Sequence, residues 1–175
     1  MIRESWRGAG RAAALLASLA VLVVGVATPA NAQTRDEHCV ILLDDDDAAT
    51  AVCADTVEAA DAVFTERTGL TRVESADAVG PLVVYSLATL YTDAGYGGSS
   101  YTFTRSSACN GVTLSSVANL GSIGMNDAVS SFFTYSSCTV RLFVDASYGG
   151  SSYGWATSQS SLPSFNDVAS SARVR

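Results

Sequence analysis

Lysine is absent from this chain of 175 residues, and all ten of its basic residues are arginines. With 17 acidic residues against those ten, the formal net charge is −7. Nucleic acids and anionic membranes are recognised through a cationic surface, which an acidic chain without basic clusters does not supply. We therefore expect a protein that binds neither nucleic acid nor a membrane surface.

Long hydrophobic runs are also scarce. The longest, at residues 12–26, is too short for a comfortable membrane span, which needs about 20 apolar residues. It follows three arginines and precedes an Ala-Asn-Ala sequence at residues 30–32, an order that is typical of a secretory signal peptide. We expect residues 1–32 to be removed, which lowers the net charge from −7 to −9 because three arginines and Glu4 leave with them. The mature protein is then secreted and extracellular.

The chain has a single histidine, His38, which limits its chemistry. Serine catalysis of the Ser-His-Asp type would have to use this residue. A zinc site would lack both a second histidine and a C-x-x-C pair. The adjacent Cys39 could be a nucleophile, but a disulfide is the commoner state of a cysteine in an exported chain. We expect no enzymatic activity.

Four cysteines, Cys39, Cys53, Cys109 and Cys138, allow three disulfide pairings. We favour Cys39 with Cys53 and Cys109 with Cys138, because each of these pairs lies within one region of the sequence. The other pairings would join the two regions.

The first region of the mature chain, residues 33–80, begins with two expected strands at residues 38–43 and 50–54. Four consecutive aspartates, residues 44–47, separate them. These carboxylates lack the alternating spacing and central glycine of an EF-hand calcium loop. We therefore interpret them as a solvated turn of a disulfide-linked hairpin.

A helix is expected next. Asp55 and Glu58 have the spacing of a capping pair, and apolar residues from Val57 to Phe64 recur at helical intervals before Gly69. The apolar face of this helix must cover either its own hairpin or the following domain. Residues 71–81 show no strong periodicity, so we expect a linker there.

From residue 81 to the end, short β-rich runs alternate with Gly and Ser clusters. The expected strands are residues 87–92, 101–104, 131–135, 140–144, 152–156 and 170–173. Many short strands with closely spaced turns predict a mainly β, antiparallel sandwich.

Two short signatures occur twice in this part of the chain, in the same order each time. An aromatic hairpin sequence spans residues 91–98 and again 143–150, and an Asn-Asp-x-x-Ser-Ser box spans residues 126–131 and again 166–171. A chain that repeats both a folding element and a cluster of oxygen ligands is expected to build a pair of similar sites. Calcium, which prefers hard oxygen ligands, is the leading candidate.

These signatures resemble the Greek key motif of the βγ-crystallins. The resemblance covers about residues 85–175 and implies two Greek keys packed into a sandwich, with each hairpin folded over the core. Tyr96 and Tyr148 are expected to fold back over the hairpins. Gly98 and Gly150 are expected at tight reversals with positive φ. Residues 33–80 have no counterpart in the motif.

In this family a calcium ion lies between the two motifs, with ligands from the polar box and a backbone carbonyl from a hairpin. The resemblance therefore implies two ligand sets, which we group box by box. The first contains Asn126, Asp127, Ser130 and the carbonyl of Ala128, and the second contains Asn166, Asp167, Ser170 and the carbonyl of Val168. Hairpin carbonyls near Thr92 and Val144 would complete them. Ser131 and Ser171 are expected to tie down the turn.

The alternative to a calcium site is a plain turn, since Asn and Asp side chains often bond their own backbone. Duplication of the box, each time after its hairpin, favours calcium. The repeat is also uneven, because 35 positions separate Tyr91 from Asn126 but only 23 separate Phe143 from Asn166. We place the surplus of about 12 residues between Arg105 and Val117, around Cys109.

The sequence thus predicts a secreted, monomeric calcium-binding protein in which Ca²⁺ stabilises the fold. Some exported proteins with the same fold are peptidase inhibitors or resemble killer toxins, so an inhibitor with a protease target is the alternative. The loop around Cys109, held by its disulfide, is where we would expect the contact with a protease. The two functions do not exclude each other.

Overall fold

The computed structural model describes residues 35–43, 49–112 and 114–175. The expected signal peptide (residues 1–32) and the four aspartates (residues 44–47) lie outside these described residues. The elements are β1 (His38–Leu43), β2 (Ala49–Ala54), α1 (Val57–Thr68), β3 (Thr71–Val73), β4 (Val83–Asp93), β5 (Gly97–Arg105), β6 (Ser115–Val117), a 3-10 turn η1 (Leu120–Ile123), β7 (Ser131–Thr134), β8 (Val140–Phe143), a second turn η2 (Ala146–Tyr148), β9 (Ser152–Ala156) and β10 (Ser171–Val174).

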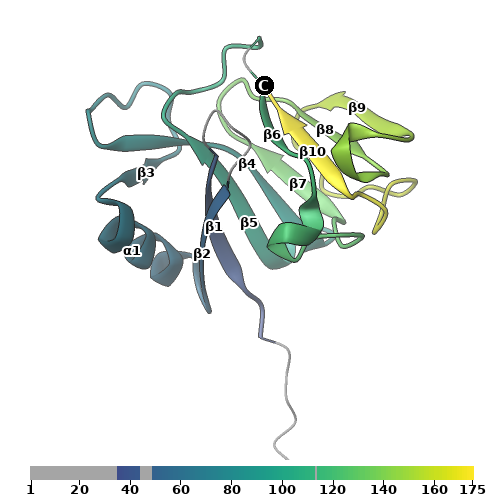
Figure 1. Cartoon of the computed structure of the whole chain (residues 1–175), viewed down its shortest axis with the longest axis horizontal. Helices are drawn as coiled ribbons and strands as arrows, with labels where there is room; N and C mark the ends of the chain where they lie inside the picture. Colours follow the sequence, from purple (N-terminus) through teal and green to yellow (C-terminus); the bar gives the residue numbers. More distant parts are fainter. Residues whose placement is uncertain (1–34, 44–48, 113) are drawn as a thin grey trace, which may run out of the picture. The chain divides into compact units, whose positions relative to one another are not determined.

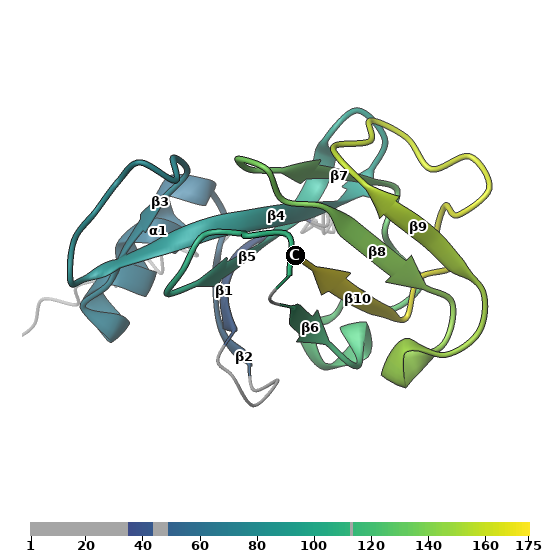
Figure 2. The same ribbon diagram turned by 90° about the horizontal axis from the view of Figure 1, so that it is seen from above.

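In the described part of the chain, ten strands form two sheets that face each other, as Figure 2 shows from above. The first sheet runs in the order β2-β1-β5-β4-β3, and β7 also pairs with β4. The second runs β6-β10-β8-β9. Between them lies the main core, with fully buried side chains such as Leu90, Phe103, Phe132 and Leu142. The expected mainly β sandwich is confirmed.

The two repeats exchange strands between these sheets. In the first repeat β4, β5 and β7 lie in the first sheet, whereas the short β6 crosses over and pairs with β10. In the second repeat β8, β9 and β10 lie in the second sheet, and Gln159 crosses back to bridge Phe132. Each motif thus contributes to both sheets, which makes the two Greek keys interdependent. The strand β6 is an addition, because the sequence placed only a loop there.

The N-terminal hairpin belongs to the first sheet. β1 pairs with β2 in antiparallel fashion and with β5 in parallel fashion, with His38 opposite Ser100. Cys39, Ile41 and Leu43 on β1 point into the main core, where each is 2% exposed or less. Residues 33–80 are therefore part of the sandwich and contribute to its core.

Helix α1 packs on the outer face of the same sheet (Figure 1). Its buried Ala60 and Phe64 contact a second core, formed with Val40, Val52 and Val84. The side chain of Thr56 caps the helix by accepting a hydrogen bond from the Ala59 amide, and Gly69 ends it at φ 71°.

Two expectations for this region were wrong. Asp55 does not cap the helix; its carboxylate instead pairs with Arg35 at 2.8 Å, and Thr56 takes the cap because its hydroxyl faces the first free amides. Residues 71–81 are not wholly a linker, since residues 71–73 form β3, which pairs in parallel with the start of β4. β4 is 11 residues long and extends beyond β7, and β3 pairs with the start of β4, which β7 does not reach.

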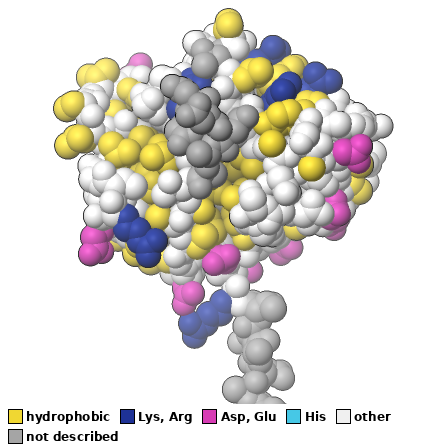
Figure 3. Space-filling model, viewed as in Figure 1, with side chains coloured by type: hydrophobic (Ala, Val, Ile, Leu, Met, Phe, Trp, Pro, Cys, Tyr) yellow, Lys and Arg dark blue, Asp and Glu magenta, His cyan; other side chains and the backbone are white. Residues whose placement is uncertain are grey.

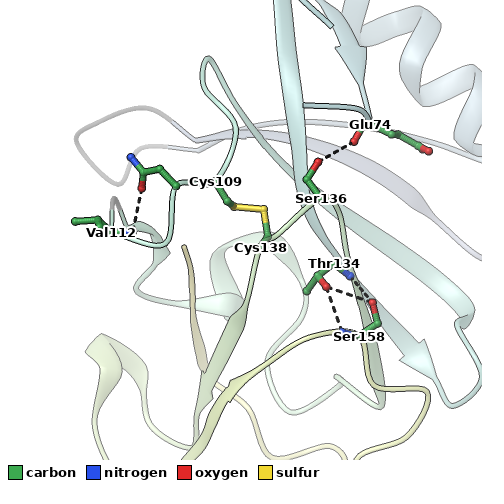
Figure 4. Close-up of a disulfide and its surroundings, with 8 residues drawn as sticks. Glu74, Cys109, Val112, Thr134, Ser136, Cys138 and Ser158 are labelled. Carbon is green, nitrogen blue, oxygen red and sulfur yellow. Dashed lines mark hydrogen bonds between the residues drawn. A yellow bond between two sulfur atoms is a disulfide. The ribbon is translucent and has the colours of Figure 1, made fainter. Parts of the chain in front are cut away.

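Both favoured disulfides are present. Cys39 and Cys53 lie opposite each other on β1 and β2. Cys109, in the long loop after β5, is joined to Cys138, in the turn between β7 and β8 (Figure 4). Close by, the Ser136 hydroxyl donates to the Glu74 carbonyl at 3.5 Å. The second disulfide therefore fastens the extra residues of the first motif to the start of the second.

Three arginines lie on the outer face of the second sheet. Figure 3 shows arginine atoms beside hydrophobic side chains at the upper right, where Figure 1 draws β8 and β10. The guanidinium of Arg173 lies 3.9 Å from the centre of the Tyr148 ring, and that of Arg175 lies 4.2 Å from Trp155. Arg141 stands opposite Arg173. Stacking on aromatic rings offsets part of the repulsion between these like charges.

Candidate functional site

The two hairpins have nearly the same geometry. In the first, the rings of Tyr91 and Tyr96 lie 5.7 Å apart between centroids, and in the second the rings of Phe143 and Tyr148 lie 5.8 Å apart. The expected folding of the second aromatic residue over each hairpin is confirmed. The two tyrosines share a φ of 65°, a conformation that is uncommon for such a bulky residue.

Glycine is required at the reversal of each hairpin. Gly98 and Gly150 have φ values of 72° and 68°, as expected from the sequence. A Cβ at Gly98 would collide with the Thr92 hydroxyl, and one at Gly150 would lie 2.7 Å from a carboxylate oxygen of Asp145. The backbone at each glycine therefore packs directly against a polar side chain of its own hairpin.

The last serine of each box connects the box to its hairpin. The Ser131 hydroxyl donates to the Asp93 carbonyl at 2.6 Å and accepts from the Tyr96 amide at 3.1 Å. Ser171 makes the equivalent bonds to Asp145, at 2.7 Å, and Tyr148, at 3.0 Å. Both serines are fully buried. This confirms the expectation that they serve the turn through hydrogen bonds.

The remaining residues of the two boxes meet across the boundary between the motifs. The Asp127 amide donates to the Ala169 carbonyl at 3.0 Å, and the Asp167 amide donates to the Val129 carbonyl at 3.1 Å. The boxes therefore lie side by side and are related by an approximate twofold arrangement.

The side chains cross in the same way. The Ser130 hydroxyl donates to Asp167 at 3.0 Å, and the Ser170 hydroxyl donates to Asp127 at 3.4 Å. Within each box the asparagine amide donates to the adjacent aspartate, from Asn126 to Asp127 at 2.7 Å and from Asn166 to Asp167 at 2.5 Å. The sequence predicts ligand sets grouped box by box, whereas the structure brings the aspartate of each box to the serine of the other.

The two aspartates are exposed and share an uncommon backbone conformation. Asp127 and Asp167 have φ values of 51° and 53°, in the left-handed region that Asp and Asn tolerate better than most residues. Both aspartates and their neighbouring asparagines are exposed, while Ser130 is buried. Each cluster thus combines an exposed carboxylate with a serine hydroxyl that is less exposed to solvent.

The backbone candidates flank these clusters. The Ser130 amide donates to the Tyr91 carbonyl at 2.9 Å, and the Ser170 amide donates to the Phe143 carbonyl at 2.8 Å. Thr92 and Val144 therefore immediately follow residues that bond the boxes. Ala128 and Val168 are half-buried and follow the two aspartates. Participation of these four carbonyls in a metal site stays a prediction.

The single histidine, His38, lies on β1 opposite Ser100 of β5. Its Nδ1 atom is 2.8 Å from the Ser100 hydroxyl, and the adjacent Cys39 is in a disulfide, so it is not a free nucleophile. Among the described residues no carboxylate hydrogen-bonds to His38, whereas a catalytic triad needs such a group to orient the histidine.

The long loop between β5 and β6 projects from the sandwich. It exposes Val112 by 80% and Leu114 by 45%. The Val112 amide donates to the Asn110 side-chain oxygen at 2.9 Å, and Cys109 anchors the loop (Figure 4). The sequence located this loop from its length and its cysteine, but gave no sign of how far its apolar residues project.

Part of the chain is similar to a known protein family. Residues 90–155 match the model of peptidase inhibitor family I36. This segment runs from the end of β4 into β9, so it contains both hairpins, the first box and the disulfide-anchored loop. No curated protein matches the chain. Among the described residues, no helix has the length and apolar character needed to span a membrane.

Several solved structures are also similar. A βγ-crystallin domain from Flavobacterium johnsoniae is 31% identical, and the match covers 93% of that domain and 51% of this chain, with a TM-score of 0.40. A βγ-crystallin from Ciona intestinalis is 26% identical over 94% of its length and 49% of this chain, with a TM-score of 0.38. These superpositions carry no part of the fold assignment, which rests on the strand order above.

Proposed function

The chain belongs to the βγ-crystallin family and is related to peptidase inhibitor family I36, and we propose that its two polar boxes bind calcium ions that stabilise an exported protein. The observation that carries this proposal is the crossed pairing of Asp127 with Ser170 and of Asp167 with Ser130. Each pair joins a carboxylate and a hydroxyl from different motifs. A cation bound there would link the two motifs.

The donor chemistry suits calcium. This ion takes 6–8 oxygen ligands in a flexible shell, and carboxylate, amide, hydroxyl and carbonyl oxygens are all present in the boxes. The exposed aspartates leave room for water to complete the shell. We assign Asp127, Asn126 and Ser170 to one site and Asp167, Asn166 and Ser130 to the other. The carbonyls of Ala128, Val168, Thr92 and Val144 are the further donors that we propose.

Weak sites would be sufficient for this role. Extracellular calcium modules bind with Kd values of order 10⁻⁴–10⁻³ M. An ion present at 100 times its Kd adds about 2.7 kcal/mol to the free energy of unfolding. This is a large part of the stability of a typical small domain, about 5–15 kcal/mol. The two disulfides are compatible with the extracellular location that we propose.

Calorimetric titration of calcium into chelator-treated residues 33–175, with melting curves before and after, tests the proposal. We expect two binding events and a higher melting temperature. Magnesium serves as the control, since its smaller, octahedral shell should give little heat. Absence of both heat and a melting shift would reduce the boxes to ordinary turns.

A second function, peptidase inhibition, is favoured by the family match and by the loop between β5 and β6. Inhibitors gain affinity when their contact loop is held in one conformation before binding. Here the Cys109–Cys138 disulfide and the Asn110 turn restrain a loop that exposes Val112 and Leu114. We propose these two side chains as the contact with a protease.

Inhibition assays against serine, cysteine and metallopeptidases test this second function. Val112→Asp and Leu114→Asp should weaken inhibition by about tenfold or more, because each places a charge in an apolar contact. Val79→Asp is the matched control, since Val79 is also an exposed valine, at 89%, and belongs to the connection between β3 and β4. Inhibition unchanged by the loop variants would move the contact elsewhere.

A further inference from the structure

The outer face of the first sheet has a covered half and an open half. Helix α1 covers the first through Ala60 and Phe64. Beside it, a cleft of about 330 Å³ opens over β4 and β5. We call it the tyrosine cleft, because Tyr91, Tyr96 and Tyr135 line it together with Arg72, Thr89 and Thr102. Small-molecule sites typically measure about 300–1,000 Å³, so its size suits a small ligand.

One wall of the tyrosine cleft continues into a row of aromatic rings. The centroids of Tyr91 and Tyr96 are 5.7 Å apart, those of Tyr96 and Phe133 are 5.9 Å apart, and those of Phe133 and Tyr135 are 5.2 Å apart. Tyr96 is 38% and Phe133 40% exposed. When the flat C–H face of a ligand covers aromatic rings that are exposed to water, burial of this apolar surface favours binding.

The floor of the cleft carries a chain of hydroxyl groups. The Thr89 hydroxyl lies 2.9 Å from that of Thr102 and 3.0 Å from the Tyr135 hydroxyl. Each hydroxyl has one donor and two acceptor positions, so this chain leaves hydrogen-bonding capacity unused. Burial raises the pKa of the Tyr135 phenol above its ordinary value, so this hydroxyl keeps its proton.

The single cation of the cleft is already neutralised. Two nitrogens of Arg72 lie 2.6 Å from the Asp61 carboxylate, and a third contact at 3.2 Å reaches Glu74. The Arg72 side chain is only 10% exposed. An anionic ligand would therefore find no unpaired guanidinium at Arg72, whereas a neutral polar ligand does not need one.

We propose that the tyrosine cleft binds a neutral oligosaccharide, with the flat faces of its pyranose rings on the tyrosine row and its hydroxyls on the Thr89 chain. Aromatic rings beside clustered hydroxyls match the two surfaces of a sugar ring, one apolar and one polar. His38, Val57 and Arg72 also line the cleft, so residues 33–80 contribute to the site. The polar boxes take no part in it.

Calorimetric titration with the hexamers of chitin, cellulose, xylan and laminarin, in calcium-containing buffer, tests the proposal. At least one hexamer should bind, and Tyr91→Ala should weaken that binding by about tenfold, the loss expected when a stacked ring is removed. Tyr135→Phe removes one hydroxyl, keeps the ring and should weaken binding several-fold, so it remains informative if Tyr91→Ala fails to fold.

Trp155→Ala is the matched control, because it removes a half-buried aromatic side chain from the other sheet and should bind normally. Melting curves establish that each variant is folded. Failure of all four hexamers to bind the folded protein would overturn the proposal. It would equally be overturned by binding that the tyrosine variants leave unchanged, or by tighter binding of polygalacturonate, which is anionic.

Discussion

At the scale of single residues, the two repeats preserve the same uncommon backbone conformations. Tyr96 and Tyr148 share a φ of 65°, and Asp127 and Asp167 have φ values of 51° and 53°. Such conformations cost free energy and persist only where the surrounding structure holds them. Their occurrence in equivalent positions indicates that the hairpin and the box are shaped as one unit, with the buried serine between them.

The crossed contacts predict which substitutions share a calcium site. Asp127→Ala and Ser170→Ala should each weaken the same binding event and leave the other nearly intact, because these side chains meet. The double variant Asp127→Ala, Ser130→Ala should lose both events. Calorimetric titration separates these cases, with the exposed Ser161→Ala as control. If Asp127→Ala with Ser130→Ala still leaves one full event, the box-by-box grouping is correct and the crossed assignment is wrong.

Ser131→Ala should destabilise the fold without removing any apolar contact. It deletes a buried hydroxyl and leaves the Asp93 carbonyl and the Tyr96 amide without their partner. Asp93 and Tyr96 are themselves exposed, so water can replace part of what is lost. At about 0.5–1.5 kcal/mol for each hydrogen bond, the two lost bonds should lower the free energy of unfolding by about 1–3 kcal/mol. Urea denaturation measures it, and the exposed Ser137→Ala is the control. A loss no larger than that of the control would contradict the proposed role.

At the scale of elements, the extra residues of the first motif form a projecting loop. The Cys109–Cys138 disulfide restrains this loop. The bridge joins positions 29 residues apart and anchors the loop to the turn before β8. The second motif connects the same points with fewer residues and has no bridge among the described residues. The loop is therefore an addition to the repeated motif, and the Cys109–Cys138 disulfide anchors it.

Replacing Cys109 and Cys138 together by alanine should lower stability even when calcium is saturating. Closing a loop of this length removes unfolded-state entropy worth about 3–4 kcal/mol. Melting curves in excess calcium measure the effect, and the Cys39→Ala, Cys53→Ala variant gives a comparison for a shorter loop of 14 residues. An unchanged melting curve for both variants would mean that the bridges are incidental.

At the scale of the whole molecule, the N-terminal region and the repeats form one folded unit. The described residues, 35–43, 49–112 and 114–175, belong to a single compact unit. β1 contributes to the main core, and α1 seals the outer face of the sheet over Val40 and Val84. Residues 33–80, which have no counterpart in the family, thus contribute to both cores of the fold and also line the tyrosine cleft.

Residues 81–175 alone should therefore be much less stable than residues 33–175. Removal of β1 uncovers the edge of β5 and opens the main core at Ile41 and Leu43. Core truncations of single large side chains already cost about 2–5 kcal/mol, and several would be lost together. Near-ultraviolet circular dichroism and urea denaturation measure this. Equal stability of the two chains would show that the hairpin and helix are dispensable additions.

The sequence by itself determined the local features of this protein. The strands at residues 38–43 and 152–156 have the predicted bounds, and both hairpins, their glycines and the buried serines of the boxes follow from the repeated signatures. These features depend on residues that are close together in the chain, where spacing and residue type are sufficient evidence. Both disulfides followed for the same reason, since each joins cysteines of one region.

Only the tertiary structure decided how distant segments meet. It crossed Asp127 with Ser170 and Asp167 with Ser130, although each aspartate has a serine of its own box three residues away. It also set β1 in parallel beside β5, about 60 residues further along the chain, and thereby brought His38 to the tyrosine cleft. Such pairings depend on the packing of whole sheets, because no local pattern specifies which remote strand or side chain will complete a given edge or site.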